Sequence, residues 1–424
     1  MSNTVTEQNE YDFFGPYSIT SYENGFDVIL KPVDRADTVT SQLWFQAGSV
    51  YESDDNNGLS HYLEHMLFKG TDEFERDRIN EMIDEVGGRQ NAGTSKDYTN
   101  YYATLPKTSW ERGPRLLEQM GYHALLPEDE FQKERQVVLS ELDRYEDDPR
   151  KKLWKEFIPM LYEGHPYERL TIGQRDVIED VTIEQLRDYY KQFYVTNRSG
   201  LVVAGGFEPD RARDMVEDLF LDEPAGEQAV HSFSDPVPPE SESIRRIQED
   251  VGQVYGMLGT IGYPASDRKS IALDVLMKVY GGSNTSRLYE NLVLKEQLAS
   301  QVSSSFWTQQ EPGPVYVQFQ TSPDRTDDLL EGIRRETSRI AEDGITREEF
   351  DRAKTQIKTQ FIYSSQTPSG QANQLGYWHT IDSVEYLNDY IDKIDSITRS
   401  DITSVAEEVL ADRNWAGVLL TPED

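Results

Sequence analysis

Residues 58–71 read Gly58-Leu-Ser-His61-Tyr-Leu-Glu64-His65-Met-Leu-Phe-Lys-Gly-Thr71, which places His-x-x-Glu-His inside an apolar run that can form a helix. Residues three and four apart lie on one helix face, so His61 and His65 can present two imidazoles to one metal ion, with Glu64 beside them. Two neutral imidazoles are a common start to a zinc site, and a neighbouring carboxylate can accept a proton from water on the metal. The pattern indicates a candidate metal centre; the alternative is a structural pair of histidines.

The composition limits both the partners and the kind of metal site. The 424 residues include no cysteine, so disulfides, thiolate ligands and cysteine nucleophiles are excluded, and any transition metal must be held by histidine and carboxylate. The formal net charge is −35, from 77 acidic and 42 basic residues, which argues against nucleic acid as a partner. Most of this charge is expected on a solvated surface, and a halophile-like host with high internal salt would screen its self-repulsion.

The start of the chain carries no targeting pattern. Its first basic residue is Lys31 and acidic residues precede it, so neither a secretory signal nor a mitochondrial transit peptide is expected. No run of about 18 apolar residues occurs, so neither a transmembrane helix nor a membrane partner is expected. We therefore expect a cytoplasmic protein.

The chain divides near its middle. Residues 223–242 are rich in proline, glycine, serine and acidic residues and read as a linker. This predicts an N-terminal domain at 15–222 that carries the metal motif and a C-terminal domain at 243–424. Residues 1–14 are expected to be disordered.

The two halves repeat one pattern. Phe131, at the start of a long amphipathic helix, is echoed 219 residues later by Phe350, and Thr182, before another helix, is echoed 216 residues later by Thr398. A nearly constant offset indicates internal duplication. Strand-like stretches are interleaved with long helices, which predicts an α+β fold. We expect two homologous domains, each a mostly antiparallel sheet with helices packed on one face, which together form half of a clamshell chamber.

Two glutamates on a later predicted helix are candidate partners of the histidines. Glu134 and Glu141 are one heptad apart, so they lie on roughly the same helix face. Exposed helix carboxylates are the usual case in so acidic a chain. The spacing alone leaves both readings open.

The chain resembles the pitrilysin-type zinc peptidases, the inverzincin group that includes insulin-degrading enzyme and the mitochondrial processing peptidase. It is most similar to their short, two-domain prokaryotic members, from about Tyr17 to the C-terminus. Besides residues 58–71 and the two glutamates, the resemblance rests on three motifs: Gly87-Gly-x-x-Asn91-Ala-x-Thr94-x-x-Asp97-x-Thr99-x-Tyr101, Gly164-His-Pro-Tyr167 and Gly281-Gly-Ser283…Ser286-Arg-Leu288.

The resemblance implies one zinc ion per chain, bound by His61, His65 and Glu141. Glu64 would be the general base that takes a proton from zinc-bound water and hands it to the leaving amine. Glu134 would hydrogen-bond a ligand imidazole and fix its orientation. The same ligands can also hold another metal, because availability as well as affinity decides the ion.

The resemblance also implies a substrate-binding segment. Asn91, Ala92 and Thr94 would belong to an edge strand beside the zinc that pairs with an extended substrate. The alternative for this segment is a turn between a helix and a strand, because Asn and Gly are common turn residues. His165, before a proline, is expected to be structural.

The second half departs from the family pattern. Ala353 and Gln360 stand at the positions that echo Glu134 and Glu141, so only the N-terminal half can build the site. Active family members also place an Arg and a Tyr seven residues apart to hold the substrate backbone and the oxyanion. Here Val293 and Ser300 occupy those positions.

The departure shapes the expected function. The resemblance implies a zinc metalloendopeptidase subunit that hydrolyses peptides or unfolded polypeptide segments and needs a paralogous partner to supply the Arg/Tyr pair. This requirement predicts a heterodimer with a homologous subunit; the alternative is a homodimer of this chain. The alternative function is a non-catalytic, peptide-binding or assembly subunit of a processing-peptidase-like complex.

Overall fold

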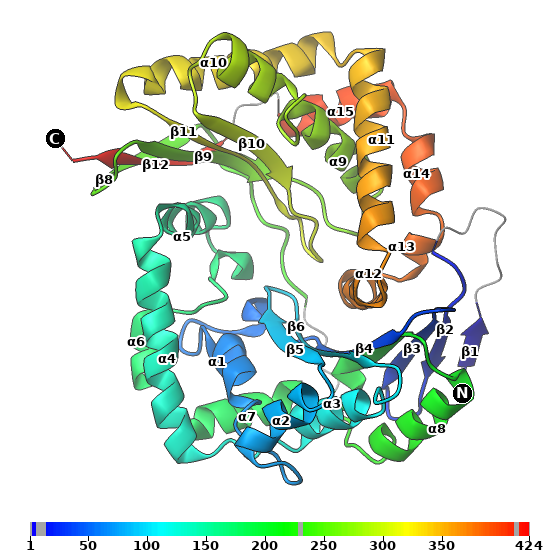
Figure 1. Cartoon of the computed structure of the whole chain (residues 1–424). Helices are drawn as coiled ribbons and strands as arrows, with labels where there is room; N and C mark the ends of the chain where they lie inside the picture. Colours follow the sequence, from blue (N-terminus) through cyan, green and yellow to red (C-terminus); the bar gives the residue numbers. More distant parts are fainter. Residues whose placement is uncertain (1, 6–13, 228–231, 411–414, 424) are drawn as a thin grey trace. The chain divides into compact units, whose positions relative to one another are not determined.

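The computed structural model describes residues 2–5, 14–227, 232–410 and 415–423 (Figure 1). The chain forms two compact units, and neither is a continuous stretch of sequence. Unit 1 comprises Met1–Leu142, Arg169–Ser232 and Ile362–Asp389, and unit 2 comprises Asp143–Glu168, Phe233–Phe361 and Tyr390–Asp424. In the described part of the chain, no helix combines the length and hydrophobicity needed to cross a bilayer.

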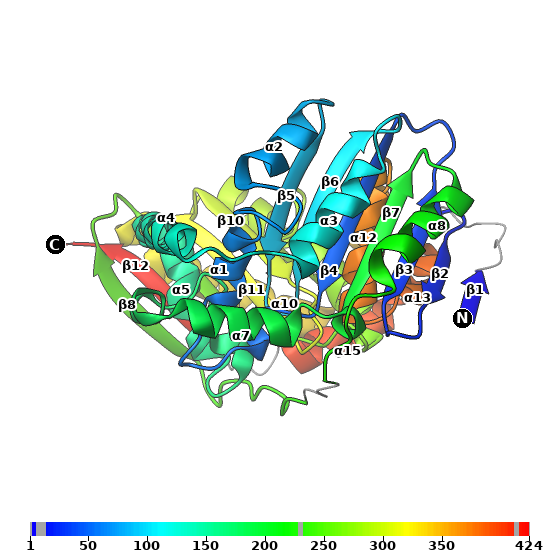
Figure 2. The same cartoon turned by 90° about the horizontal axis from the view of Figure 1, so that it is seen from below.

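Unit 1 is built on a seven-stranded sheet in the order β1-β2-β3-β7-β4-β6-β5 (Figure 2). All neighbouring strands are antiparallel except β3 and β7, which are parallel. The strands are β1 (Ser2–Val5), β2 (Ser18–Ser21), β3 (Asp27–Pro32), β4 (Thr38–Phe45), β5 (Arg89–Thr94), β6 (Thr99–Pro106) and β7 (Ser199–Gly205). The disorder expected for residues 1–14 falls mostly on residues 1 and 6–13, outside the described residues, whereas Ser2–Val5 form the edge strand β1.

Unit 2 repeats the core of this sheet. Its order, β10-β11-β9-β12-β8, corresponds strand by strand to β5-β6-β4-β7-β3, and the single parallel pair, β12 with β8, falls at the same place. The strands are β8 (Ser243–Glu249), β9 (Val254–Ile261), β10 (Gln301–Phe306), β11 (Pro314–Thr321) and β12 (Ala416–Pro422). The predicted α+β fold with two homologous, mostly antiparallel sheets is confirmed.

The helices are divided between the two units. Unit 1 contains α1 (Leu59–Met66), α2 (Arg76–Asp84), α3 (Arg112–Tyr122), α4 (Glu128–Asp147), α6 (Arg175–Asp180), α7 (Ile183–Phe193), α8 (Pro209–Phe220), α12 (Pro368–Ile381) and α13 (Glu385–Asn388). Unit 2 contains α5 (Pro149–Leu161), α9 (Lys269–Tyr280), α10 (Thr326–Asp343), α11 (Arg347–Ser364), α14 (Tyr390–Ser396), α15 (Arg399–Val409) and the π-helix η4 (Tyr289–Lys295). Short 3₁₀ turns lie at η1 (Ser49–Tyr51), η2 (Pro166–Glu168), η3 (Thr196–Arg198) and η5 (Pro323–Arg325).

The echoed threonines begin equivalent helices. Thr182 caps α7 and Thr398 caps α15, each through a capping box in which the threonine accepts from the third helical residue and that residue's side chain accepts from the threonine N–H. These caps satisfy N–H groups that have no partner inside the helix. The 216-residue echo therefore marks the same local structure in both halves.

In each unit, a helix from the other half of the sequence packs on the sheet. α12 packs on β4 and β7 in unit 1, and α5 packs on the equivalent strands β9 and β12 in unit 2. On β4, Trp44 lies against Gly376 of α12, whereas Leu43 and Phe45 lie against Gly121 of α3. Alternate residues of a strand face opposite sides of a sheet, so α12 covers the face that α3 leaves open.

This exchange was not predicted, because the expected boundaries at 15–222 and 243–424 follow the sequence order of the duplicated halves. The strands that repeat, β3–β7 and β8–β12, lie on either side of residues 223–242. The described residues of the expected linker, 223–227 and 232–242, contain no helix or strand, and β8 begins at Ser243. The compact units, by contrast, each include a helix encoded on the far side of the linker.

Arg287 ties the segment before η4 to the start of α11. Its Nε and Nη2 donate to the two carboxylate oxygens of Glu349 at 2.6 and 2.9 Å, and Glu349 also accepts from the N–H and hydroxyl of Thr346. Burial alone would raise the pKa of Glu349, but the Arg287 and Thr346 hydrogen bonds hold it at about 2. The arginine of the Ser286-Arg-Leu288 motif is thus a structural residue of unit 2.

Loss of the ion pair between Arg287 and Glu349 is expected to make the free energy of unfolding less dependent on pH in the acid range. The folded pKa of about 2 lies below the ordinary 4.5, so the pair stabilises the protein above about pH 4.5 and this contribution disappears as the pH falls toward 2. We expect Glu349→Gln to lower the free energy of unfolding by about 3 kcal/mol at pH 7 and by much less at pH 3. Urea unfolding of both proteins at the two pH values measures this; an equal loss at both would contradict it.

Candidate metal centre

The helix α1 is held at its N-terminus by a buried carboxylate. Glu52 accepts from the N–H groups of Gly58 and Ser60 at 2.8 and 2.7 Å, from the Ser60 hydroxyl at 2.6 Å and from the Asn57 amide at 2.8 Å. A negative charge at this end also suits the helix dipole. Gly58 has a φ of +107° and lies within contact distance of Gly173, so a side chain there would be strained and crowded. Glu52 and Gly58 therefore set where α1 begins.

The buried face of α1 fixes its position against α4. Leu59, Leu63 and Met66 are at most 1% exposed. The Tyr62 ring stacks on Phe131 of α4 with centroids 4.8 Å apart, and its hydroxyl donates to the Phe131 carbonyl at 2.5 Å. This contact, at the start of the amphipathic helix quoted above, brings the later turns of α4 to the polar face of α1.

Three predicted metal ligands meet where α1 and α4 pack. The Nε2 atoms of His61 and His65 lie 3.7 and 3.6 Å from the same oxygen, Oε2 of Glu141. The two imidazole centroids are 4.8 Å apart, and the three ligand atoms lie within 4.8 Å of one another. The structure thus brings His61, His65 and Glu141 together around one point, with two nitrogen donors and one oxygen donor.

The environment of the histidines suits metal binding. Burial, together with the neighbouring His65, lowers the pKa of His61 to about 3, so His61 is neutral and its nitrogen lone pair is free for a cation. Burial also lowers the pKa of His65, but its hydrogen bond to Glu134 and the charges of Glu64, Glu134 and Glu141 outweigh this and raise it. A positive charge at this point is therefore favoured.

Glu134 lies at the place expected of it and has a partner that the sequence did not reveal. Its Oε1 is 2.8 Å from His65 Nδ1, and its Oε2 is 2.5 Å from Lys69 Nζ. The carboxylate is only 8% exposed. Its bond to Nδ1 fixes the ring and leaves Nε2 facing Glu141. Lys69 belongs to the motif at residues 58–71, four residues after His65. Because α1 ends at Met66, Lys69 is outside the helix, and helical spacing could not predict its contact with Glu134.

Removing the Glu134 carboxylate is expected to weaken metal binding without removing a ligand. In Glu134→Gln we expect zinc affinity to fall about 10- to 100-fold, because His65 loses its charged orienting partner. Competition with a chromogenic chelator measures the change. Glu128→Gln, an exposed residue at the start of the same helix, is the matched control. Equal zinc affinity in the two variants would show that Glu134 does not orient the ligand.

Glu64 points toward β5. Its Oε2 accepts from the Thr94 hydroxyl at 2.5 Å, and the Thr94 hydroxyl in turn lies 3.5 Å from that of Thr99. Burial raises the pKa of Glu64, and the Thr94 hydrogen bond opposes this only in part. A carboxylate with a raised pKa is a stronger proton acceptor than an exposed one.

The segment predicted to bind substrate is an edge strand and not a turn. β5 pairs with β6 on one side, with Ala92 opposite Tyr101, and has no second partner among the described strands. Ala92 and Thr94 share one face because strand residues alternate, whereas Asn91 lies on the other face and is exposed. The structure therefore brings Thr94 to Glu64, but Asn91 to solvent.

The other residues discussed from the sequence belong to none of the groups of possible metal ligands found among the described residues. Val293 is in η4, and Ser300 precedes β10, where both its N–H and its hydroxyl donate to the carbonyl of Gln320. Ala353 is buried in α11. His165 is buried, and its Nδ1 accepts from the N–H of Tyr167 at 3.1 Å, which fits a structural role.

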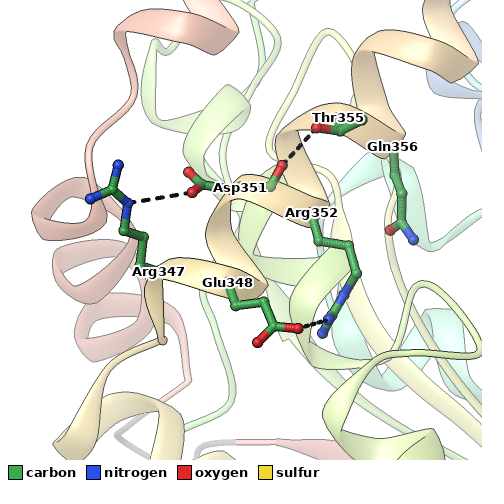
Figure 3. Close-up of a pocket in the computed structure, with 6 residues that line it drawn as sticks. All are labelled: Arg347, Glu348, Asp351, Arg352, Thr355 and Gln356. Atoms are coloured by element: carbon green, nitrogen blue, oxygen red, sulfur yellow. Dashed lines mark hydrogen bonds and ion pairs between the residues drawn. The ribbon is translucent and has the colours of Figure 1, made fainter.

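Unit 2 also contains a hollow of about 690 Å³ on α11 (Figure 3). Its charged side chains form ion pairs within the helix: Arg347 Nε is 3.5 Å from Asp351, and Arg352 Nη1 is 3.4 Å from Glu348. Such pairs leave little charge with which to recruit a ligand. We assign no function to this hollow.

Two family models match the sequence. "Insulinase (Peptidase family M16)" matches residues 28–175, which contain the residues gathered around α1 and α4. "Peptidase M16 inactive domain" matches residues 180–357, which begin in the first half and lie mostly in the half that lacks the ligands.

Similar proteins span nearly the whole chain. A Bacillus subtilis protein named "Uncharacterized zinc protease YmxG" is 27% identical over 403 residues, which cover 94% of this chain and 97% of the relative. An Arabidopsis thaliana protein named "Probable mitochondrial-processing peptidase subunit beta" is 26% identical and covers 94% of this chain and 77% of the relative. Among solved structures, a protease from Helicobacter pylori has a TM-score of 0.91 at 24% identity, covering 96% of this chain and 99% of that one.

Proposed function

Because the chain belongs to peptidase family M16, we propose that it is a zinc endopeptidase subunit that hydrolyses peptides or unfolded polypeptide segments. The observation that carries the proposal is the convergence of His61, His65 and Glu141 beside the partly buried carboxylate of Glu64. Three protein ligands with a nearby acid are the usual protein contribution to a catalytic zinc site.

The donor set fits zinc. One carboxylate oxygen faces two imidazole nitrogens at 3.6 and 3.7 Å, distances too long for hydrogen bonds and suited to a shared cation. His61 is neutral, and the Nδ1 of His65 is occupied by Glu134, so each ring offers Nε2. Zinc held by these residues would polarise a water molecule and the carbonyl of the scissile bond.

Glu64 is assigned the proton transfers. It takes a proton from the attacking water as the oxygen bonds to the carbonyl carbon, and it delivers that proton to the leaving amine nitrogen as the peptide bond breaks. Thr94 donates to Oε2 of Glu64, which leaves Oε1 to face the reacting water. Thr94 is thus assigned to positioning the base rather than to contact with substrate.

The open edge of β5 is assigned to substrate. An extended peptide that adds to this edge would form main-chain hydrogen bonds with residues 89–94, next to the strand residue that contacts Glu64. Main-chain pairing is independent of side-chain identity, so the selection is for unfolded polypeptide rather than for one sequence. Asn91 is exposed on the face of β5 opposite to Thr94. It is assigned to substrate pairing through its main chain, without a contact to Glu64.

A homologous partner is proposed to complete the site. Val293 cannot donate a hydrogen bond, and both donors of Ser300 are already used on Gln320, so neither can stabilise an oxyanion. The Arabidopsis relative is named a subunit, which supports assembly with a second chain. In this proposal the partner supplies the missing Arg and Tyr and closes the catalytic chamber.

The test is cleavage of an unstructured peptide by the purified chain, measured alone and with each candidate paralogue. We expect cleavage that a chelator removes and added zinc restores, and a strong increase with a paralogue that carries the Arg/Tyr pair. Full activity of the isolated chain, unchanged after mutation of Val293 and Ser300, would refute the partner requirement. A complete absence of cleavage with every paralogue, despite bound zinc, would favour a non-catalytic peptide-binding or assembly subunit.

A further inference from the structure

A second group of donor atoms lies in unit 1, outside the centre built by α1 and α4. His123 is the residue that ends α3, Glu118 lies in the last turns of that helix, and Glu223 follows α8 at the start of the expected linker. Oε1 of Glu118 and Oε1 of Glu223 lie 2.8 and 3.0 Å from the same atom, Nε2 of His123. Carboxylates from two separate segments therefore converge on one ring nitrogen.

Hydrogen bonding alone does not account for this convergence. Nε2 carries at most one hydrogen, so it can donate fully to only one of the two carboxylates. The other ring nitrogen, Nδ1, is 3.6 Å from Oδ2 of Asp72, too far for a good hydrogen bond. Even a protonated His123 would leave the two glutamates and Asp72 with an excess of negative charge.

The excess charge is poorly exposed to water. The side chains of Glu118 and Glu223 are only 6% and 12% exposed, and among the described residues each forms its ion pair with His123 alone. The Gln119 amide donates to Glu118 at 3.2 Å but brings no charge. Buried carboxylates of this kind need a cation.

We propose that Glu118, His123 and Glu223 form a second metal site, which takes a divalent transition-metal ion such as Zn²⁺. One ligand atom from each of the three residues lies within 4.8 Å of the other two. Ligand atoms on one tetrahedral zinc ion, at bonds of about 2.0–2.1 Å, lie roughly 3.3 Å apart, so the carboxylate oxygens at 2.8 and 3.0 Å from Nε2 would move outward by a few tenths of an ångström to share an ion. The site is at the C-terminal end of α3, where the helix dipole favours positive charge. His123, 31% exposed, leaves a path for the ion.

The role of this site is structural. The metal would fasten the end of α3 to the first residue of the segment that joins the two halves. Three residues further on, the side chain of Asn197 holds the backbone of Gly226 through two hydrogen bonds, at 3.0 and 2.9 Å. The metal would thus hold Glu223 while Asn197 holds Gly226, so residues 223–226, at the start of the linker, would be fixed at both ends.

The test counts zinc in the full chain after the first centre has been emptied. In His61→Ala, titrated with Zn²⁺ by calorimetry in KCl with excess magnesium to occupy the acidic surface, we expect one equivalent to remain. Adding His123→Ala or Glu223→Gln should remove it. The readout is stoichiometry and not cleavage, so the outcome is independent of whether the chain proves to be a peptidase.

The matched control is His61→Ala with His379→Ala. His379 also pairs with a carboxylate, at 2.9 Å from Asp27, but among the described residues it belongs to no group of three possible metal ligands, so this variant should keep one equivalent. Should His123→Ala fail to fold, Glu223→Gln decides, because it leaves the pair of His123 and Glu118 in place. Absence of zinc from His61→Ala, or equal binding by all the double variants, would overturn the proposal and leave an imidazolium held by two carboxylates.

Discussion

Replacing Glu64 by glutamine is expected to abolish peptide cleavage while zinc stays bound. Glutamine has nearly the same shape and can still pair with Thr94, but it cannot take a proton from the attacking water. We expect kcat/KM to fall by about 10²- to 10⁴-fold, the range in which a positioned general base contributes. Peptide cleavage with the partner present, together with zinc content, measures both parts of the prediction.

The control for this variant is Asp84→Asn, which removes one carboxylate charge from an exposed position at the end of α2. It should cleave at the wild-type rate. If Glu64→Gln kept its activity, another residue would have to be the base. If it lost zinc as well as activity, Glu64 would be a ligand and not the proton acceptor.

Replacing Glu141 by glutamine is expected to remove both the metal and the activity. Glu141 is the one oxygen donor facing both imidazoles, and its loss leaves two nitrogen ligands for the ion. We expect zinc affinity to fall by more than about 100-fold, which exceeds the effect of losing an orienting residue such as Glu134. Metal analysis after dialysis against a weak chelator measures this, and cleavage should fall to background.

Two variants test whether the effect of Glu141 is specific to its place on α4. Asp143→Asn removes an exposed carboxylate two residues further along the same helix and should leave zinc binding unchanged. Gln360→Glu places a carboxylate at the echoed position of α11 and should create no metal site, because residues 243–424 contain a single histidine, His379. Retention of zinc by Glu141→Gln would exclude Glu141 as a ligand.

Local patterns in the sequence predicted most of the fold. Strand-like stretches interleaved with long helices predicted the α+β fold. The near-constant offset between Thr182 and Thr398 predicted the duplication that the two sheets display. The exchange of α5 and α12 could not be predicted in this way. Which sheet a helix covers depends on long-range packing, such as Trp44 against Gly376, which leaves no periodic signal.

The residues of the candidate site also fall into those that local sequence patterns predicted and those that depend on long-range packing. His61, Glu64 and His65 lie within one turn of a helix, so their spacing predicted their common face. Glu134 and Glu141 needed family resemblance, because an acidic chain carries many paired carboxylates. Glu52 and Lys69 were missed, since each acts through a partner set by tertiary structure.

The placement of α12 has a consequence for the order of events on the ribosome. β7 ends at Gly205 and α12 ends at Ile381, so 176 further residues must be synthesised before the second face of the first sheet can be covered. At a typical synthesis rate of about 5–20 residues per second, this delay is roughly 9–35 s. During that interval Trp44 and its neighbours on β4 and β7 face solvent. Nascent chains of this protein are therefore expected to depend on a chaperone until α12, which ends at Ile381, has been synthesised.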